Sequence, residues 1–307
     1  MVTRKQAVDA RPPSPGSFSL SLWERAGVRA AAGGSYVYIT LDSPTTRNAL
    51  TDEMVNGIQD AITHAESHPA TRALILRGAA HTFCAGGDFS NFRALMAAPA
   101  PPTAPDPIAT FNRAFGAMLE RLQACAVPTI AVVEGAAMGG GCGLAAACDF
   151  VLASSTAQFG MPEVTLGLPP AQIAPFIAAR LGRGAALRLM LTGRRISAAQ
   201  ALACSLADEV ADPDALDARL HALLTDLGRA EPAALRATKA IVQRCQHQTL
   251  GDTLDNTLGD TLDFASHAFA AALRSGTAAE GIAALTTKRP AQWVVQPASK
   301  PVDGATP

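Results

Sequence analysis

The chain has few charged and few aromatic residues for its length of 307. Only 17% of its residues are charged and 5% are aromatic, whereas 49% are hydrophobic. The net charge of −1, without a basic cluster, argues against a nucleic-acid partner. Because alanine and leucine supply most of the apolar mass, the composition favours helices packed closely around a sheet over a β-sandwich.

The chain also lacks the signatures of a disulfide framework, a metal site and a membrane segment. Its six cysteines form no Cys-x-x-Cys pair, which is typical of buried thiols in a reducing compartment. His64, Glu66 and His68 lack the spacing of a helical zinc motif, so we predict no metal. The uncharged run 135–148 is too short to cross a bilayer, and no secretory segment opens the chain. We expect a cytoplasmic enzyme without a membrane partner.

Regular patterns begin near Ser35. Four short β-rich runs, separated by helical stretches, predict parallel strands joined by crossovers; they cover residues 36–42, 72–78, 128–135 and 148–154. Thr51 is a good N-cap for one helix, and residues 108–123 predict another.

Composition divides the chain into four parts. Residues 1–34 mix prolines, serines and charges without a period, which predicts a disordered leader, and we expect that deleting residues 1–33 would not change stability. Residues 35–211 predict the core, residues 212–293 a helical region and residues 294–307 a disordered tail. The Pro/Ala-rich stretch 96–107 predicts a flexible loop.

Glycines are concentrated at the ends of two predicted strands, where the next element begins. They occur in HTFCAGGDF (81–89) and in EGAAMGGGCGLAAACD (134–149). Glycine lets backbone N–H groups approach a ligand, and a helix start favours negative charge. Two such sources at one point would form an oxyanion hole.

A third stretch, STAQFGMPEVTLGLPP (155–170), carries Glu163 in a loop. Taken alone, each stretch is more typical of a tight turn, of close packing or of a solvated acid, and only their order and spacing together favour a site. Neither a phosphate loop nor a dinucleotide fingerprint is present.

Four segments resemble the enoyl-CoA hydratase/isomerase (crotonase) superfamily: FCAGGD, PTIAVVEGAAMGGGCGLAAACDFVLAS, AQFGMPEVTLGL and LTGRRISAAQALACSLADEV. The resemblance covers about residues 35–293. It implies an α/β fold in which stacked ββα turns form a spiral, followed by a helical trimerisation region. It also implies an acyl-CoA substrate, no cofactor apart from the coenzyme A of that substrate, and a homotrimer or hexamer.

The resemblance also implies the roles of individual residues. The backbone N–H groups of Gly87 and Gly140 would hold the thioester oxygen, and Glu163 would be the catalytic carboxylate. Basic residues at the end of the helical region would approach the phosphates of coenzyme A, sometimes from a neighbouring subunit; an ordinary solvated helix end is an equal alternative. The further substrate-binding or coenzyme-A-binding positions are Ala85, Gly86, Asp88, Gly139, Gly141, Lys288 and Arg289.

The chain departs from the typical hydratase at one position. Typical hydratases carry a second glutamate in GGGCEL, where this chain has Gly143. Hydration normally uses one group to orient water and another to exchange a proton with Cα. Either Glu163 serves both purposes, or another side chain or a water network replaces the missing carboxylate, or hydratase activity is lost.

A narrower resemblance involves NRAFGAMLE (112–120), GGGCGLAAACD and PAQIAPFIAARLG (170–182). These segments are similar to the isohexenylglutaconyl-CoA hydratases of acyclic terpene catabolism and to the 3-methylglutaconyl-CoA hydratases, which can also lack the first glutamate. The distal carboxylate of such a substrate would then occupy the space left at Gly143. The alternatives are another enoyl-CoA hydratase, a one-carboxylate isomerase and a non-catalytic CoA-binding protein.

Overall fold

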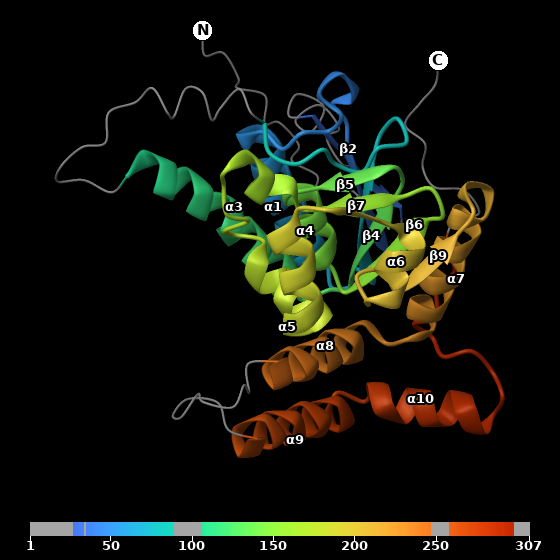
Figure 1. The fold of residues 1–307 in the computed structure, drawn as a ribbon. Coiled ribbons are helices and arrows are strands. Elements are labelled where there is room, and N and C mark those ends of the chain that lie inside the picture. Colours follow the sequence, from blue (N-terminus) through green and yellow to red (C-terminus); the bar gives the residue numbers. More distant parts are fainter. Residues whose placement is uncertain (1–26, 34, 89–105, 247–257, 298–307) are drawn as a thin grey trace, which may run out of the picture.

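The computed structural model describes residues 27–33, 35–88, 106–246 and 258–297. The first part of the predicted leader and most of the predicted loop 96–107 lie outside the described residues. In Figure 1 a central group of strands is surrounded by helices, and the last helices form a separate layer beneath it.

The larger sheet has the strand order β1-β2-β3-β4-β6-β9, and every neighbouring pair is parallel except β1 with β2. The four predicted strands and the crossovers between them are confirmed. They are β2 (Tyr36–Leu41), β3 (Ala73–Gly78), β4 (Thr129–Val133) and β6 (Phe150–Ser154), to which the structure adds β1 (Val28–Gly33) and β9 (Glu209–Ala211).

Both faces of this sheet are covered. On β3, Leu74 and Leu76 face one hydrophobic cluster, whereas Ile75 faces a second one. Side chains alternate between the faces of a strand, so a strand buried on both sides reads as a continuous apolar run. Helix α7 (Pro213–Arg229) covers the second face with Leu216 and other leucines.

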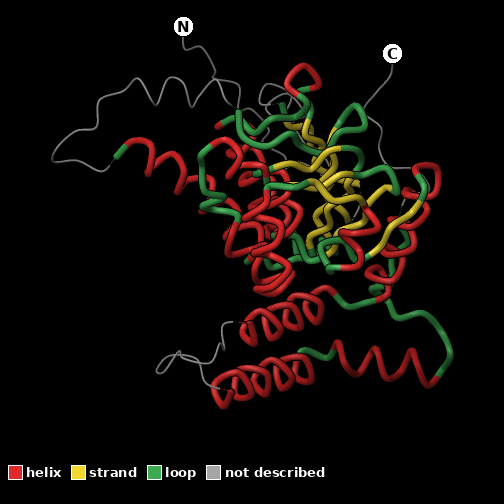
Figure 2. Tube along the Cα trace, viewed as in Figure 1, coloured by secondary structure: helices red, strands yellow, loops and turns green. Residues whose placement is uncertain are grey.

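The first face packs against helices and a second, three-stranded sheet. That sheet has the order β5-β7-β8, formed by β5 (Ala136–Met138), β7 (Gln158–Gly160) and β8 (Arg195–Ser197). The helices of the core are α1 (Asp52–Ser67), α3 (Pro107–Gln123), α4 (Gly140–Ala146), α5 (Ala174–Thr192) and α6 (Ala198–Ala203). Figure 2 shows most of these helices on one side of the strands.

The predicted helix starts are confirmed at α1 and α3. Thr51 accepts a hydrogen bond from the N–H of Met54 and caps α1. Helix α3 begins at Pro107, one residue before the predicted start, because Asp106 caps it.

After the core, the regular elements of the described residues are helices. They are α7 and then α8 (Pro232–Gln246), α9 (Leu258–Arg274) and α10 (Thr277–Thr286). In Figure 1, α8 lies beneath the core, and α9 and α10 lie below it.

The predicted leader extends too far. Residues 28–33 form β1, which pairs antiparallel with the whole of β2, and Val28 is completely buried. The run of alanines in this strand has little β-propensity, so its extended form depends on pairing with the β2 edge. The expectation that residues up to 33 contribute nothing to packing is therefore wrong.

The predicted tail begins too early. The N–H of Val295 donates to the Gly228 carbonyl on α7, and the indole of Trp293 donates to the Arg229 carbonyl. A Cβ at Gly228 would lie 2.4 Å from the Val295 carbonyl oxygen, so the backbones are in close contact. Residues 294–297 thus belong to the folded part, and residues 298–307 lie outside the described residues.

Two truncations test the role of β1. A chain beginning at Gly34 should melt about 5 °C or more below a chain beginning at Gly27, since it loses the buried Val28 and exposes the β2 edge. Differential scanning calorimetry of both proteins measures this difference. Equal melting temperatures would mean that β1 does not stabilise the core.

Candidate active site

The first glycine turn lies between the end of β3 and α3 and runs beside residues 47–50. Leu50 and Gly87 form a parallel bridge, in which the Leu50 N–H donates to the Gly86 carbonyl and the Asp88 N–H to the Leu50 carbonyl. The Ala85 N–H donates to the Arg47 carbonyl. These bonds fix the backbone of residues 85–88 at the start of the candidate site.

Gly86 brings this turn against the second glycine stretch. Its φ of +102° lies in a region that residues with a side chain rarely adopt. A Cβ on Gly86 would lie 3.0 Å from the Met138 carbonyl oxygen and 3.7 Å from the Gly140 nitrogen. The two glycine stretches predicted from the sequence therefore meet at the N-terminus of α4.

The second stretch turns from β5 into α4 at Gly139, whose φ is +50°. Gly141 also needs to be glycine, because a Cβ there would lie 2.6 Å from the Cys84 carbonyl oxygen. Among the described residues, neither the Gly87 N–H nor the Gly140 N–H donates to a backbone carbonyl. These two N–H groups are thus available as hydrogen-bond donors in the region where the turns meet.

Glu163 approaches the same place from another element. It lies in the first turn of the short helix η4 (Pro162–Leu166), and its Oε1 is 2.9 Å from the position of a Cβ on Gly139. Its Oε2 is buried and has no hydrogen-bond partner among the residues that the structure describes. Burial raises the pKa of this carboxyl, an effect that its own backbone N–H partly offsets. A proton-accepting group with a raised pKa is typical of catalytic sites.

The Cys142 thiol lies close enough to Glu163 to be affected by its charge. Burial, and after it the Glu163 carboxylate, raise the pKa of this thiol to about 12. A thiol with such a pKa stays protonated at neutral pH, so Cys142 is no nucleophile here. Glu163 is thus a buried carboxyl beside the place where the two glycine turns meet.

The position of the missing glutamate is not empty. A Cβ on Gly143 would lie 2.2 Å from Cγ2 and 2.7 Å from Cβ of Ile173. Ile173 is 3% exposed and directly precedes α5. Ile173 therefore fills the place that the first side-chain atom of a residue at position 143 would take, while the expectation that a substrate carboxylate lies near Gly143 stays a prediction.

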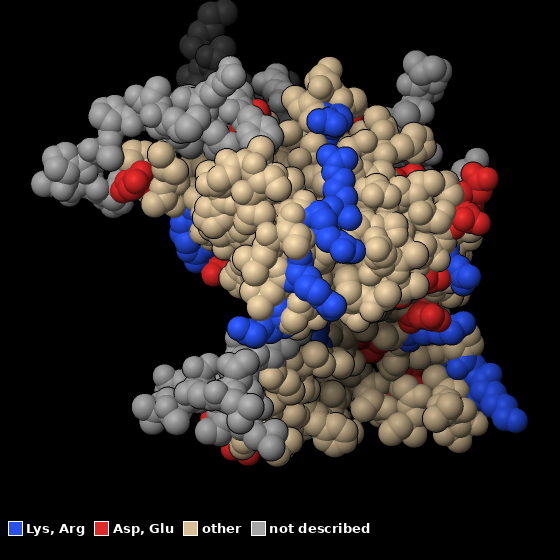
Figure 3. Space-filling model, in the orientation of Figure 1, with Lys and Arg blue, Asp and Glu red and all other residues tan. Residues whose placement is uncertain are grey.

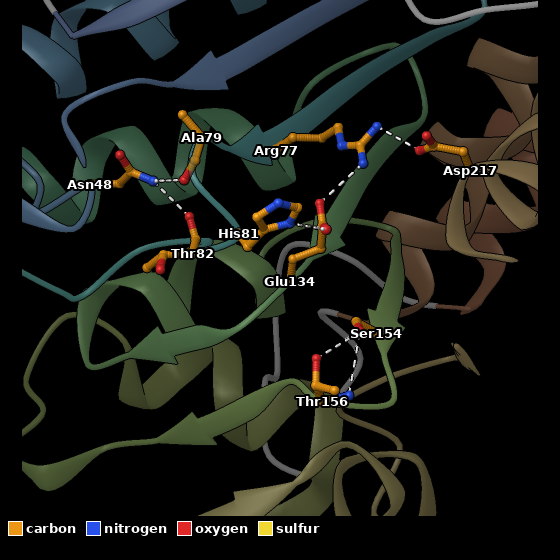
Figure 4. A network of polar contacts seen from close by, with 9 residues as sticks. All are labelled: Asn48, Arg77, Ala79, His81, Thr82, Glu134, Ser154, Thr156 and Asp217. Carbon is orange, nitrogen blue, oxygen red and sulfur yellow. Dashed lines mark hydrogen bonds and ion pairs between the residues drawn. The ribbon is translucent and has the colours of Figure 1, made fainter. Parts of the chain in front are cut away.

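Three contacts that the sequence alone did not reveal complete the surroundings. Leu50 Cδ1 and Phe115 Cζ each lie 3.2 Å from the position of a Cβ on Gly140. Asn48 is fully buried and joins three loops: it donates to the carbonyls of Ala79 and Thr82 and accepts from the Ser43 N–H (Figure 4). Phe115 lies in NRAFGAMLE (112–120), a segment of the narrower resemblance, but no pattern of the sequence indicated these contacts.

A second polar network lies at the ends of β3 and β4. Glu134 accepts hydrogen bonds from Arg77 and His81, and Arg77 also pairs with Asp217 on α7 (Figure 4). The His81 side chain is 92% exposed. This network joins α7 to the sheet, and His81 takes part in it through its contact with Glu134.

Lys288 and Arg289 lie apart from the site within one chain. They follow α10, which Figure 1 places in the lower layer, away from α4. Arg289 forms a two-bond ion pair with Glu280, at 2.7 and 2.9 Å. One copy of the chain therefore does not bring these two residues to Glu163.

A cavity of about 450 Å³ lies at the opposite end of α4 from the glycine turns, between that end, α5, α7 and α8. Its charged lining residues, Asp149, Arg180 and Lys239, all have partners in ion pairs. Within the described ranges, no cluster of metal-ligating side chains occurs, and no helix is long and apolar enough to span a membrane.

Solved structures with the same fold are numerous. An enoyl-CoA hydratase/isomerase from Marinobacter aquaeolei is 37% identical with a TM-score of 0.82, and the match covers 88% of this chain and 99% of that one. Pseudomonas aeruginosa AtuE is 38% identical with a TM-score of 0.80, covering 88% and 100%. The crotonase fold expected from the sequence is confirmed.

A family model described as enoyl-CoA hydratase/isomerase matches residues 32–296. A probable enoyl-CoA hydratase from Mycobacterium bovis is 33% identical over 256 residues, which are 83% of this chain and 93% of that protein. The 2,3-dehydroadipyl-CoA hydratase of Escherichia coli is 32% identical over 213 residues, covering 69% and 80%. The chain belongs to the enoyl-CoA hydratase/isomerase family and is an enzyme of that family.

The raised pKa of Glu163 predicts a pH-dependent effect on stability. Its folded-state pKa lies above the unfolded value, so the folded protein loses stability as pH rises from the unfolded pKa through the folded one. Glu163→Gln removes this loss. The melting temperature of the variant relative to wild type should therefore increase from pH 4 to pH 8.

Thermal melts of both proteins across this range measure the effect. Glu53→Gln, at an exposed position of α1, is the matched control and should show no such trend. A pH-independent difference between Glu163→Gln and wild type would contradict a desolvated carboxyl.

Proposed function

We propose that the protein is a hydratase of a branched glutaconyl-type enoyl-CoA, similar to isohexenylglutaconyl-CoA hydratase, with Glu163 as its one catalytic carboxylate. The observation that carries this proposal is the meeting of the two glycine turns beside a buried, unpaired glutamate. The Gly87 and Gly140 N–H groups hold the thioester oxygen as negative charge develops on it. Each such donor lowers the barrier by about 2.7–4 kcal/mol.

The chemistry needs only one carboxylate if it acts twice. Glu163 accepts a proton from water as the hydroxyl adds to Cβ, and it then delivers that proton to Cα, where the enolate collapses. The raised pKa supports this role, since it makes the carboxylate a stronger base than an exposed glutamate. The overall reaction adds one water and leaves Glu163 ionised again.

The choice of substrate rests on the narrower sequence resemblance. Its segments 112–120 and 170–182 lie against each other: Gln172 donates to Asn112 across 2.8 Å. Phe115, in the first of them, borders Gly140, and Ile173, in the second, borders Gly143. The segments that carry the resemblance are therefore neighbours of the proposed oxyanion hole. The name of the Escherichia coli relative also specifies hydration of an enoyl-CoA.

A one-carboxylate enoyl-CoA isomerase is the second candidate, and the absence of a carboxylate at Gly143 favours it. The two reactions differ in their effect on the conjugated thioester. Hydration removes its ultraviolet absorbance, whereas isomerisation into conjugation increases it.

A panel of isohexenylglutaconyl-CoA, 3-methylglutaconyl-CoA, crotonyl-CoA and an unconjugated enoyl-CoA tests the proposal. We expect the absorbance of the branched glutaconyl thioesters to fall and their turnover to exceed that of crotonyl-CoA. An increase with the unconjugated substrate alone would identify an isomerase and overturn the hydratase.

Replacing the carboxylate tests its role directly. Glu163→Gln should lower kcat by about 10²–10⁴-fold, as expected for one acid–base group. Acyl-CoA binding, measured by calorimetry, should change little because the backbone donors remain. Glu53→Gln should retain wild-type kcat, and a Glu163→Gln enzyme with more than half the wild-type kcat would exclude Glu163 from catalysis.

We also propose that the enzyme assembles as a homotrimer, alone or as a hexamer. On α9, Leu262, Phe269 and Leu273 are 57%, 69% and 51% exposed, and their spacing places them on one side of the helix. On α10, Ile282 and Leu285 are also exposed. Figure 3 shows few charged side chains over this layer. Such an apolar surface supports burial against another subunit, which would bring Lys288 and Arg289 near a neighbouring site.

A charge on this surface should weaken the assembly. Phe269→Glu is expected to shift the protein towards monomers at micromolar concentration, because the charge would be buried in the interface. Size-exclusion chromatography with light scattering measures the mass. Asn56→Glu, on the exposed side of α1, is the control and should keep the wild-type mass. A monomeric wild-type protein would contradict the trimer.

A further inference from the structure

The stretch between Glu163 and α5 fills two glycine positions with two consecutive side chains. Gln172 Oε1 lies 1.9 Å from the position of a Cβ on Gly116 of α3, and Ile173 Cγ2 lies 2.2 Å from that of a Cβ on Gly143 of α4. Neither glycine has a positive φ, so both are needed for space and not for backbone conformation. A side chain at Gly116 would displace the end of the flexible Gln172 side chain, whereas one at Gly143 would also meet Cβ of Ile173 and so push the stretch away from α4.

The Ile173 contact lies next to the catalytic carboxylate. The Gly143 N–H donates to the Gly139 carbonyl at 3.1 Å, so the two glycines are one helical turn apart. Glu163 Oε1 covers Gly139, and Ile173 Cγ2 covers Gly143. Glu163 and Ile173 therefore fill the places of side chains at two positions one turn apart, at the N-cap and in the first turn of α4.

A glutamate at Gly143 cannot coexist with this isoleucine. Its Cβ would overlap both Cγ2 and Cβ of Ile173, at 2.2 and 2.7 Å, whereas the Ile173 Cα would be 3.6 Å away, an ordinary contact. Truncation of Ile173 to alanine leaves the 2.7 Å overlap, and only glycine removes it. A carboxylate forced into this apolar contact would also lose its hydration.

We propose that Ile173 is a specificity-determining residue of this active site: by filling the place of a side chain at Gly143, it restricts the site to the single carboxylate Glu163. A second carboxylate then requires both positions to change together. This inference rests on the proposed function, because it concerns which enoyl-CoA substrates one carboxylate can hydrate. It identifies packing between α4 and the residue before α5 as the feature that separates this enzyme from a two-carboxylate hydratase.

A double-mutant cycle tests the packing. Gly143→Glu alone should lower the melting temperature by about 10 °C, since it overpacks a buried contact. Adding Ile173→Gly should recover at least half of that loss, whereas adding Ile173→Ala should not. Gly184→Glu, at a glycine of α5 with nothing within 4 Å, is the matched control and should change the melting temperature little. If Gly143→Glu does not fold, Gly143→Ala takes its place in the cycle, because its Cβ meets the same overlap.

Turnover tests the consequence. Gly143→Glu/Ile173→Gly should hydrate crotonyl-CoA at least tenfold faster than Ile173→Gly alone. The proposal is overturned if Gly143→Glu is as stable as wild type, if Ile173→Gly rescues no more than Ile173→Ala, if the double variant does not fold, or if its crotonyl-CoA turnover equals that of Ile173→Gly.

The two proposals fail in different ways. The thermal cycle uses no substrate, so it judges the Ile173 contact even if the acyl-CoA panel disproves the hydratase. Conversely, failure of wild-type protein to hydrate any thioester of the panel would disprove the proposed function while the coupling between Gly143 and Ile173 stands.

Discussion

Close contact of the residues around Glu163 with the glycine side of α4 is the constraint on which the rest of the site depends. The lack of a side chain at Gly139 leaves space for the Glu163 carboxylate, and the lack of one at Gly143 leaves space for Ile173. Both contacts require that α4 present bare backbone there, while Gly141 admits the Cys84 backbone on another side of the same helix. Helix α4 is thus packed through glycines on more than one side, and its first four residues, 140–143, have low helix propensity.

The contacts around α4 stabilise the fold, whereas the buried carboxylate of the site destabilises it. The Glu163 oxygen without a partner among the described residues is unfavourable in a buried position. The larger sheet opposes this cost, because its strands β3, β4 and β6 are buried on both faces. A partly desolvated carboxylate is a stronger base than a solvated one. The burial of Glu163, which reduces stability, is therefore the feature that the proposed chemistry uses.

The contacts of Gln172 and Ile173 connect the proposed choice of substrate to the packing of helices. Their glycine partners lie on α3 and α4, and α3 also provides Phe115 beside Gly140. A change in either helix would therefore shift the elements on both sides of the proposed oxyanion hole. In a tightly packed interior such shifts are resisted, which is why two positions must change together to admit a second carboxylate.

The sequence by itself determined the main parallel strands, the starts of α1 and α3, the crotonase fold and the residues gathered around α4. The strands, the helix starts and the gathered glycines follow from local patterns, whereas the crotonase fold was implied by the resemblance to that superfamily. It could not predict β1, because a strand of alanines is extended only through its pairing with β2. The fold of residues 294–297 likewise depends on contacts with α7, far away in the sequence.

The features of the site also separate into those predicted from the sequence and those decided by the tertiary structure. The sequence indicated Glu163 and the glycine turns, and it showed that Gly143 lacks a carboxylate. Only the tertiary structure decided what occupies that position, because Ile173 reaches it from thirty positions further along the chain, through the packing of the residue before α5 against α4. Spacing in a sequence can identify a missing side chain, but only the packing of distant segments determines whether the space is open to a substrate or filled by the protein.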